Sequence, residues 1–154
     1  MKVTADMDAL FRGIDKLKED GYKVARSMGV AAGQLMRDEA KANVGVETGK
    51  LRGAIYVAFD ERTSTANRVR YNVSWNATKA PHGHLVEFGH WQRNVQVQLP
   101  SGQWITTNER LPQPVFVKPQ AFLRRAYDTL RPTLMRVAIT AGQRRLRQLT
   151  NGGS

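Results

Sequence analysis

Apolar residues recur at steps of three and four along the first quarter of the chain. The stripe includes Ile14, Leu17, Val24 and Met28. Because this spacing puts apolar side chains on one face of a helix, it predicts a long helix within residues 1–42, beginning near residue 6. Glycines interrupt the pattern, and a break near Gly21 is compatible with it, since each glycine weakens a helix by up to about 1 kcal/mol relative to alanine.

The second half of this predicted helix carries three small residues, Gly29, Ala32 and Gly33. Where glycine replaces a larger side chain, another backbone can approach closely. Long isolated helices are only marginally stable in water. We therefore expect this flat face to pack on a sheet or on a neighbouring subunit.

The middle of the chain changes to a period of two, which is typical of strands. Residues 54–60 and 68–75 show this alternation. The polar loop 61–67 between them predicts an antiparallel hairpin. We interpret residues 85–88 as a further strand that continues the same sheet.

A second and more polar hairpin is predicted from residues 93–99 and 103–107, which flank the turn residues Pro100-Ser-Gly102. Its apolar residues are few: Val95, Val97, Leu99, Trp104 and Ile105. A half-apolar hairpin is expected to project from the body of the protein. It can then clasp a neighbouring chain or form a surface flap without a partner, and the residues alone leave both interpretations open.

Prolines mark the approach to the C-terminal part of the chain. Pro112 and Pro114 predict an extended connector, because proline fixes the backbone and removes a hydrogen-bond donor. A helical segment is predicted over residues 119–149, with Phe122 in its buried stripe. Pro132 should kink or break this helix.

These elements predict an α+β protein with a single domain spanning residues 1–154. A long N-terminal helix is followed by a mostly antiparallel sheet with a projecting hairpin within residues 54–107, and then by a C-terminal helix. The hydrophobic fraction of 41% suits a modest core together with subunit contacts. No apolar run approaches the roughly 20 residues that span a bilayer, and the first residues lack the apolar core of a signal peptide, so we expect no membrane partner.

Charge and cysteine content restrict the function classes further. The chain has no cysteine, which excludes disulfides and thiolate metal sites and agrees with assembly in the cytosol. The net charge is +11, and residues 118–154 carry eight basic residues against Asp128 alone. Such a basic segment can contact nucleic acid, an acidic protein or only solvent.

Glu87 is an acidic residue in an apolar context, flanked by Leu85, Val86 and Phe88. A buried carboxylate is costly unless it is paired. Two interpretations remain open: a half-exposed acid on a strand, or an acid that pairs with an arginine, within the chain or across a subunit boundary.

Other candidate chemistry is weak. His82, His84 and His90 lie close in sequence, but no cysteine or nearby aspartate completes a zinc site, so exposed histidines are the better interpretation. Gly49-Lys50 lacks the spacing and the Ser/Thr of a phosphate-binding loop. We predict no catalytic residue, no cofactor and no metal. A nucleic-acid-binding module is the main alternative, because the C-terminal arginines could neutralise phosphates.

Three stretches together resemble one protein family: Thr48-Gly-Lys-Leu-Arg52, Leu85-Val-Glu-Phe-Gly89 and Pro119-Gln-Ala-Phe-Leu-Arg-Arg-Ala126. Their order and spacing are similar to those of the small neck or tail-completion proteins of long-tailed double-stranded DNA bacteriophages, also described as minor tail components or head–tail connector proteins. The chain departs from the family at His90, where threonine is common, and in its longer and more basic C-terminal end.

The resemblance implies a structural virion protein at the head–tail junction, assembled in the host cytoplasm. Copies would form a six- or twelve-fold ring that contacts a head-closure or adaptor protein and a tail terminator or tube protein, with genome DNA passing through the lumen. Candidate subunit or partner contacts are Arg52, Glu87, Phe88, Val95, Val97, Trp104, Phe122, Arg124 and Arg125. Candidate contacts with DNA or an acidic partner are Arg136, Arg144, Arg145 and Arg147.

Overall fold

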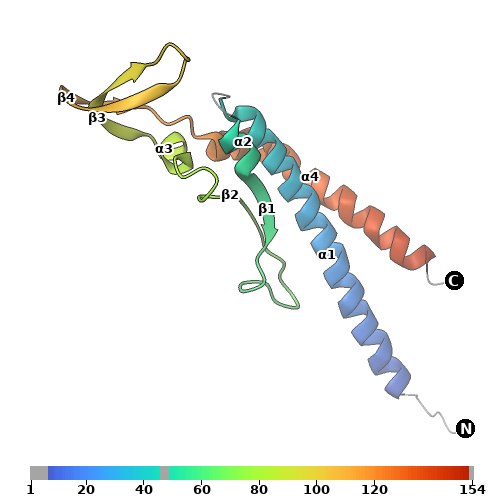
Figure 1. Ribbon diagram of the computed structural model, residues 1–154. Helices are drawn as coiled ribbons and strands as arrows, with labels where there is room; N and C mark the ends of the chain where they lie inside the picture. Colours follow the sequence, from blue (N-terminus) through green and yellow to red (C-terminus); the bar gives the residue numbers. More distant parts are fainter. Residues whose placement is uncertain (1–6, 46–48, 153–154) are drawn as a thin grey trace, which may run out of the picture.

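The computed structural model describes the backbone of residues 7–45 and 49–152, and the side chains of residues 12–45 and 49–152. The elements are α1 (Met7–Asn43), α2 (Lys50–Ala54), β1 (Ile55–Phe59), β2 (Tyr71–Trp75), α3 (Gly83–Phe88), β3 (His90–Gln98), β4 (Trp104–Val117) and α4 (Phe122–Asn151) (Figure 1). The predicted α+β class is confirmed. One long helix precedes and another follows, in the sequence, a middle region with two antiparallel two-stranded sheets.

The two long helices lie side by side and run antiparallel, and α1 extends beyond the C-terminal end of α4 (Figure 1). Their contact is close at Gly142, where an added Cβ would lie 2.8 Å from Cγ of Met28 and 3.4 Å from Cγ1 of Val24. Helix α1 is continuous over 37 residues, so the break considered at Gly21 does not occur. The packing against α4 supplies the stability that an isolated helix lacks.

The β1–β2 hairpin packs on another side of α1, at the small residues. A Cβ added at Gly29 would lie 2.5 Å from the Tyr71 ring, and one added at Gly33 would lie 2.8 Å from Cγ1 of Val57. The guanidinium of Arg26 on α1 lies 4.4 Å from the ring centroid of Phe59. The expectation that this face packs on a sheet is therefore confirmed, although β2 begins at Tyr71, later than predicted.

The buried core is small and lies where the C-terminal end of α1, α2, α3 and the start of α4 meet. Its residues are Ala40, Val44, Leu51, Ala54, Ile55, Ala80, Phe122 and Ala126. Phe122 is the largest fully buried side chain of the described residues, and its ring packs edge-on against Trp75 at a centroid distance of 5.8 Å. We call this region the junction, because the other parts of the chain extend from it.

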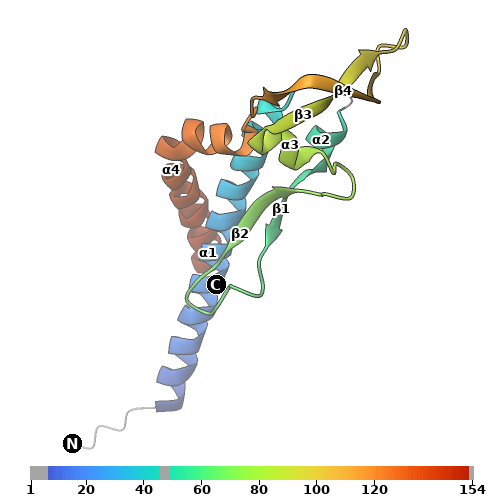
Figure 2. The same cartoon turned by 90° about the vertical axis from the view of Figure 1, so that its left-hand side faces the viewer.

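Strands β3 and β4 form an arm that projects from the junction, away from the α1–α4 pair (Figures 1 and 2). The two strands pair antiparallel from His90↔Val117 at the root to Gln98↔Trp104 at the tip, with two register shifts between. The second hairpin was thus predicted correctly, but β4 runs on through Pro112 and Pro114 to Val117. Proline is tolerated here because both strands of a two-stranded ribbon are edges.

The structure corrects the prediction for residues 85–88, which lie in helix α3 and not in a strand. A run of four apolar or mixed residues is too short for its period to separate helix from strand. At the C-terminal helix, Pro132 does not interrupt α4, which starts at Phe122 and is continuous to Asn151. Figure 2 shows α4 changing direction after its first turns, as expected for a helix that contains a proline.

Candidate functional site: the junction, the arm and the arginines of α4

Glu87 joins α3 to the start of α4. Its side chain is only 6% exposed, and its two carboxylate oxygens accept hydrogen bonds from the backbone N–H groups of Leu123 (2.9 Å) and Arg124 (3.2 Å). The first N–H groups of a helix have no partner within the helix. Ala121 precedes α4 and offers no side-chain cap, and the first turn contains no acid, so Glu87 caps this helix from a distant part of the sequence.

This arrangement corrects the interpretation of Glu87 as a half-exposed acid on a strand, and also that of an arginine partner within the chain. The side chain is buried and not half-exposed, and its partners within the described chain are two amides and not an arginine. The partial positive charge at a helix N-terminus stabilises the carboxylate in the place of a basic side chain. The backbone reinforces the contact, because the carbonyl of Val86 accepts the N–H of Gln120 at 2.8 Å.

Gly89 connects α3 to the root of the arm. Its φ is +75°, and a Cβ at this position would lie 2.6 Å from the carbonyl oxygen of Val117 and 3.0 Å from Cδ of Pro119. Only glycine adopts this conformation without strain and also leaves room for the neighbouring backbone. The Leu85–Gly89 and Pro119–Ala126 stretches, far apart in sequence, therefore meet and fix the arm to α4.

The Thr48–Arg52 motif contributes one buried residue to the junction. Leu51 of α2 is buried in the core, whereas Arg52 is exposed on the same helix. Gly49 precedes α2 with a φ of +68°. Thr48, which opens the motif, lies outside the described residues.

The arm leaves large apolar side chains uncovered. At its root the rings of Trp91 and Phe116 pack against each other across the two strands in a tilted arrangement, with centroids 5.3 Å apart, yet they are 62% and 45% exposed. Phe88, at the end of α3, is 63% exposed, and Trp104 near the tip is 54% exposed. Uncovered apolar groups gathered on one projecting element are typical of a protein contact surface.

The candidate contact residues divide into two groups. Those with exposed side chains are Arg52, Phe88, Val97, Trp104, Arg124 and Arg125, and Val95 is half-buried. Glu87 and Phe122 are buried within the chain, so their role lies in holding the junction. Trp91 and Phe116 are not among the predicted contact residues. The signal in the sequence was two bulky aromatic residues close to Gly89 and Pro119.

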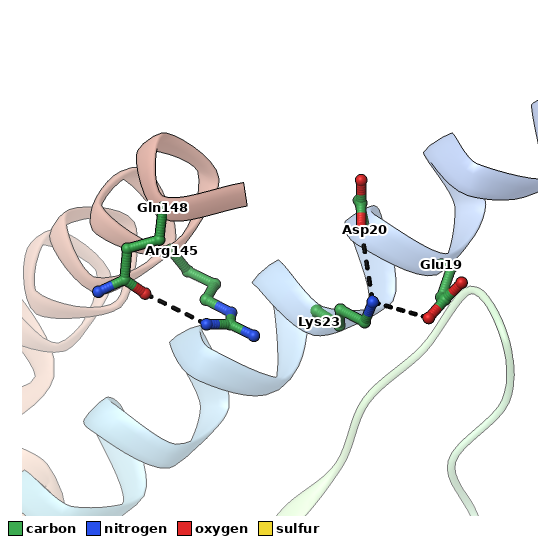
Figure 3. Close-up of polar contacts among 5 residues, drawn as sticks. All are labelled: Glu19, Asp20, Lys23, Arg145 and Gln148. Carbon is green, nitrogen blue, oxygen red and sulfur yellow. Dashed lines mark hydrogen bonds and ion pairs between the residues drawn. The ribbon is translucent and has the colours of Figure 1, made fainter. Parts of the chain in front are cut away.

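Within the residues that the structure describes, the arginines of α4 have no carboxylate partner. Arg136, Arg144 and Arg147 are exposed, and half-buried Arg145 donates from Nη1 to the side-chain oxygen of Gln148 at 3.2 Å (Figure 3). Among the residues that the structure describes, no arginine of α4 forms an ion pair.

Glu19 and Asp20 of α1 pair with a lysine of their own helix. Nζ of Lys23 lies 2.7 Å from Glu19 and 3.6 Å from Asp20 (Figure 3). The hydrogen bond from Lys23 lowers the pKa of the Glu19 carboxyl, and the same hydrogen bond raises the pKa of Lys23. The positive charge of α4 is therefore not balanced by these carboxylates.

The histidines lie in different local settings. Nδ1 of His84 is 2.8 Å from the carbonyl oxygen of Pro81, and His90 begins β3. In residues 7–45 and 49–152, no group of three or more histidine, cysteine, aspartate or glutamate side chains could hold a metal ion. The helices in these ranges include none that is long and apolar enough to cross a membrane.

Comparisons with known proteins give one match. Neither the curated proteins nor the solved structures include one that matches the chain. Because the sequence profile of the family described as "Bacteriophage HK97-gp10, putative tail-component" matches residues 8–89, more than half of the 154 residues, this protein belongs to that family of non-enzymatic structural proteins of the phage tail.

Proposed function

We propose that this tail component acts at the neck of the virion, where copies form a ring that joins the head connector to the tail and lets the genome pass. The observation that carries the proposal is the arm of β3 and β4, a projecting hairpin whose aromatic side chains are left uncovered by the chain itself. The family match ends at Gly89, so the arm lies outside the matched residues and supports the proposal independently of the match.

The position of the arm favours a ring over a symmetric dimer. It projects from one side of the junction, and the α1–α4 pair extends to the other (Figure 1). A neighbour that receives the arm would use a different surface from the one that the arm presents. Such head-to-tail contacts repeat a fixed rotation between copies, and they form a ring where that rotation closes and an open filament where it does not. Six or twelve copies are the expected numbers.

The junction can supply that fixed rotation. Glu87 and Val86 hold the start of α4, while Gly89 leads directly into β3. The angle between the arm and α4 is thereby set by hydrogen bonds to the buried Glu87 carboxylate and by a residue without a side chain. A buried polar group whose hydrogen bonds are satisfied specifies one geometry.

We place the subunit contact on the exposed residues around the arm. They are Phe88, Trp91, Val97, Trp104 and Phe116, with Val95 half-buried among them. Arg124 and Arg125 at the start of α4, and Arg52 on α2, are exposed near the junction and are candidates for polar contacts at the edge of the interface. The neighbouring proteins would be a head-closure or adaptor protein on one side and a tail terminator or tube protein on the other.

The test is the mass of the purified protein in solution at low and high salt, alone and with candidate neck proteins. We expect a complex of six or twelve copies whose mass does not depend on salt. The variant Trp91→Ser/Phe116→Ser should lose it, whereas the control Tyr56→Ser, which removes an exposed aromatic from β1, should keep it. If both variants assembled as the native chain does, the arm would not be the subunit contact.

A nucleic-acid-binding module is the second candidate, favoured by the arginines of α4 that lack carboxylate partners in the described structure. It predicts a monomer under all conditions of the same experiment. Its affinity for duplex DNA would fall steeply with salt, because phosphate contacts release bound counterions.

A further inference from the structure

Helix α4 carries an exposed apolar stripe in addition to the residues that pack on α1. Met135, Ile139 and Leu146 are 67%, 44% and 51% exposed. Their spacing of four and seven residues places them on one side of the helix. A soluble helix normally presents polar groups on a surface of this kind, so the stripe needs an explanation.

The apolar surface continues from α4 onto α1. Leu146 and Leu149 border an open groove of about 790 Å³ together with Ile14 and Leu17 of α1. Ile14 is 38% exposed and Leu17 is 74% exposed. This surface lies along the helix pair and is separate from the arm (Figure 1).

Arginines follow one edge of the stripe. Arg136 comes directly after Met135, and Arg147 comes directly after Leu146, so the two guanidinium groups are offset to the same side of the apolar residues. Eleven residues of helix separate them by about 16 Å along the axis. Both side chains are exposed, and neither forms an ion pair in the part of the chain that the structure describes.

We propose that this surface of α4 docks an acidic protein other than this chain, through an apolar strip on that protein that is flanked by carboxylates. Apolar side chains together with arginine are typical of the centre of protein interfaces, and arginine pairs with carboxylates through two parallel hydrogen bonds. The inference rests on the structural role proposed above, but not on the ring or the arm.

Two other occupants of this surface fit less well: a second copy of this chain, because of its charge, and duplex DNA, because it offers no apolar surface. A second copy has a net charge of +11, so its overall charge opposes docking against Arg136 and Arg147, and its arm carries Arg93 and Arg110 against Glu109 alone. Duplex DNA would satisfy Arg136 and Arg147, but its phosphate surface offers nothing to Met135, Ile139 and Leu146. Apolar groups next to phosphates would lose water without gaining a contact.

The test measures the binding of the full-length protein to three labelled probes by fluorescence anisotropy. The first is an amphipathic helical peptide with leucines on one face and glutamates along the edges. The second is the same peptide with serines in the place of the leucines, and the third is duplex DNA of mixed sequence. We expect the leucine peptide to bind at least about tenfold more tightly than the serine peptide, a difference of about 1.4 kcal/mol.

Two variants of the protein separate the apolar and the charged contributions. Met135→Ser/Ile139→Ser/Leu146→Ser should lose about tenfold in affinity for the leucine peptide, and Arg136→Gln/Arg147→Gln should lose a similar factor for both peptides. The matched control Arg62→Gln/Arg68→Gln removes the same charge from exposed positions in the loop between β1 and β2 and should leave the preference for leucine unchanged. All of these side chains are exposed, so the variants are expected to fold, and thermal unfolding checks this.

Two results would overturn the inference. One is equal binding of the leucine and serine peptides. The other is DNA binding that is tighter than peptide binding and is unaffected by the serine variant, which would assign the surface to nucleic acid. The variant Trp91→Ser/Phe116→Ser should bind the leucine peptide normally, so loss of the ring and loss of this docking surface give different results.

Discussion

The junction buries its large apolar side chain and pairs its carboxylate, whereas the arm leaves large apolar side chains exposed. At the junction, Phe122 is fully buried and the Glu87 carboxylate has two backbone N–H partners. Along the arm, Trp91 and Phe116 are largely exposed. The single chain thus buries the apolar groups of the junction by itself but does not cover those of the arm.

This difference indicates how a chain with a small core can serve as an assembly part. The junction uses most of the buried residues to fix the directions in which α1, α4 and the arm extend. The stability of the single chain is therefore expected to depend on the junction. Its assembly is expected to depend on surfaces that contribute little to its own folding.

The largest predicted effect on stability comes from replacing one phenylalanine by alanine, at the junction or in the arm. Phe122→Ala should lower the free energy of unfolding by about 4 kcal/mol, because a fully buried phenylalanine leaves a cavity. Phe116→Ala should lower it by no more than about 1 kcal/mol, since its ring is already half in water. Urea unfolding at low protein concentration measures both, and equal losses would contradict the comparison.

The cap on α4 gives the next largest effect. Glu87→Ala should cost about 3 kcal/mol, because it leaves two partly buried amides without acceptors, removes a helix cap and empties a buried side-chain position. The control Glu109→Ala lies on the exposed part of the arm and should change stability by less than about 0.5 kcal/mol. If both substitutions had the same small effect in thermal unfolding, Glu87 would not be holding the junction.

Replacing two glycines of α1 by alanine should change the free energy of unfolding in opposite directions. Gly29→Ala should destabilise the protein by about 1–3 kcal/mol, because its Cβ would enter the Tyr71 ring. Gly21→Ala has open space around the new Cβ and should stabilise the helix by up to about 1 kcal/mol. Denaturant midpoints of the two variants check this, and a stabilising Gly29→Ala would show that β2 does not pack closely on α1.

The smallest effect concerns the loop between β1 and β2. The hydroxyl of Thr63 donates to the Asp60 carboxylate at 2.6 Å, which holds the pKa of Asp60 below its usual range. Since the folded pKa is depressed, the stabilisation is present above the ordinary value of about 3.9 and is lost as the pH falls through the folded value.

Asp60→Asn should therefore flatten the fall in melting temperature below about pH 4. The neighbouring variant Glu61→Gln is the control and should follow the native curve. Identical acid curves for both variants and the native chain would mean that the Asp60–Thr63 contact does not contribute to stability.

The long elements could be predicted from the sequence because their periods repeat many times. The helix predicted from residue 6 to residue 42 is observed as Met7–Asn43, and the strand predicted over residues 54–60 is observed as Ile55–Phe59. The short helix α3 was missed, since a single turn does not reveal its period. The extension of β4 through two prolines was missed because an edge strand tolerates them.

The partner of Glu87 could not be read from side-chain chemistry. Backbone N–H groups are present at every residue except proline, so no residue type marks the two that Glu87 caps. The available clue was negative: the start of α4 has no Ser, Thr, Asp or Asn of its own at the cap position, where Ala121 stands. A buried acid elsewhere in the chain was the group that could supply the acceptor.

The most direct test of the account is amide hydrogen exchange on the native protein and on Trp91→Ser/Phe116→Ser, at a concentration where the native chain assembles. We expect the amides of Leu123 and Arg124 to exchange slowly in both proteins, because Glu87 caps them within one chain. We expect β3 and β4 to be protected in the native assembly and to exchange much faster in the variant. Equal protection of the arm in both proteins would contradict the claim that another copy completes it.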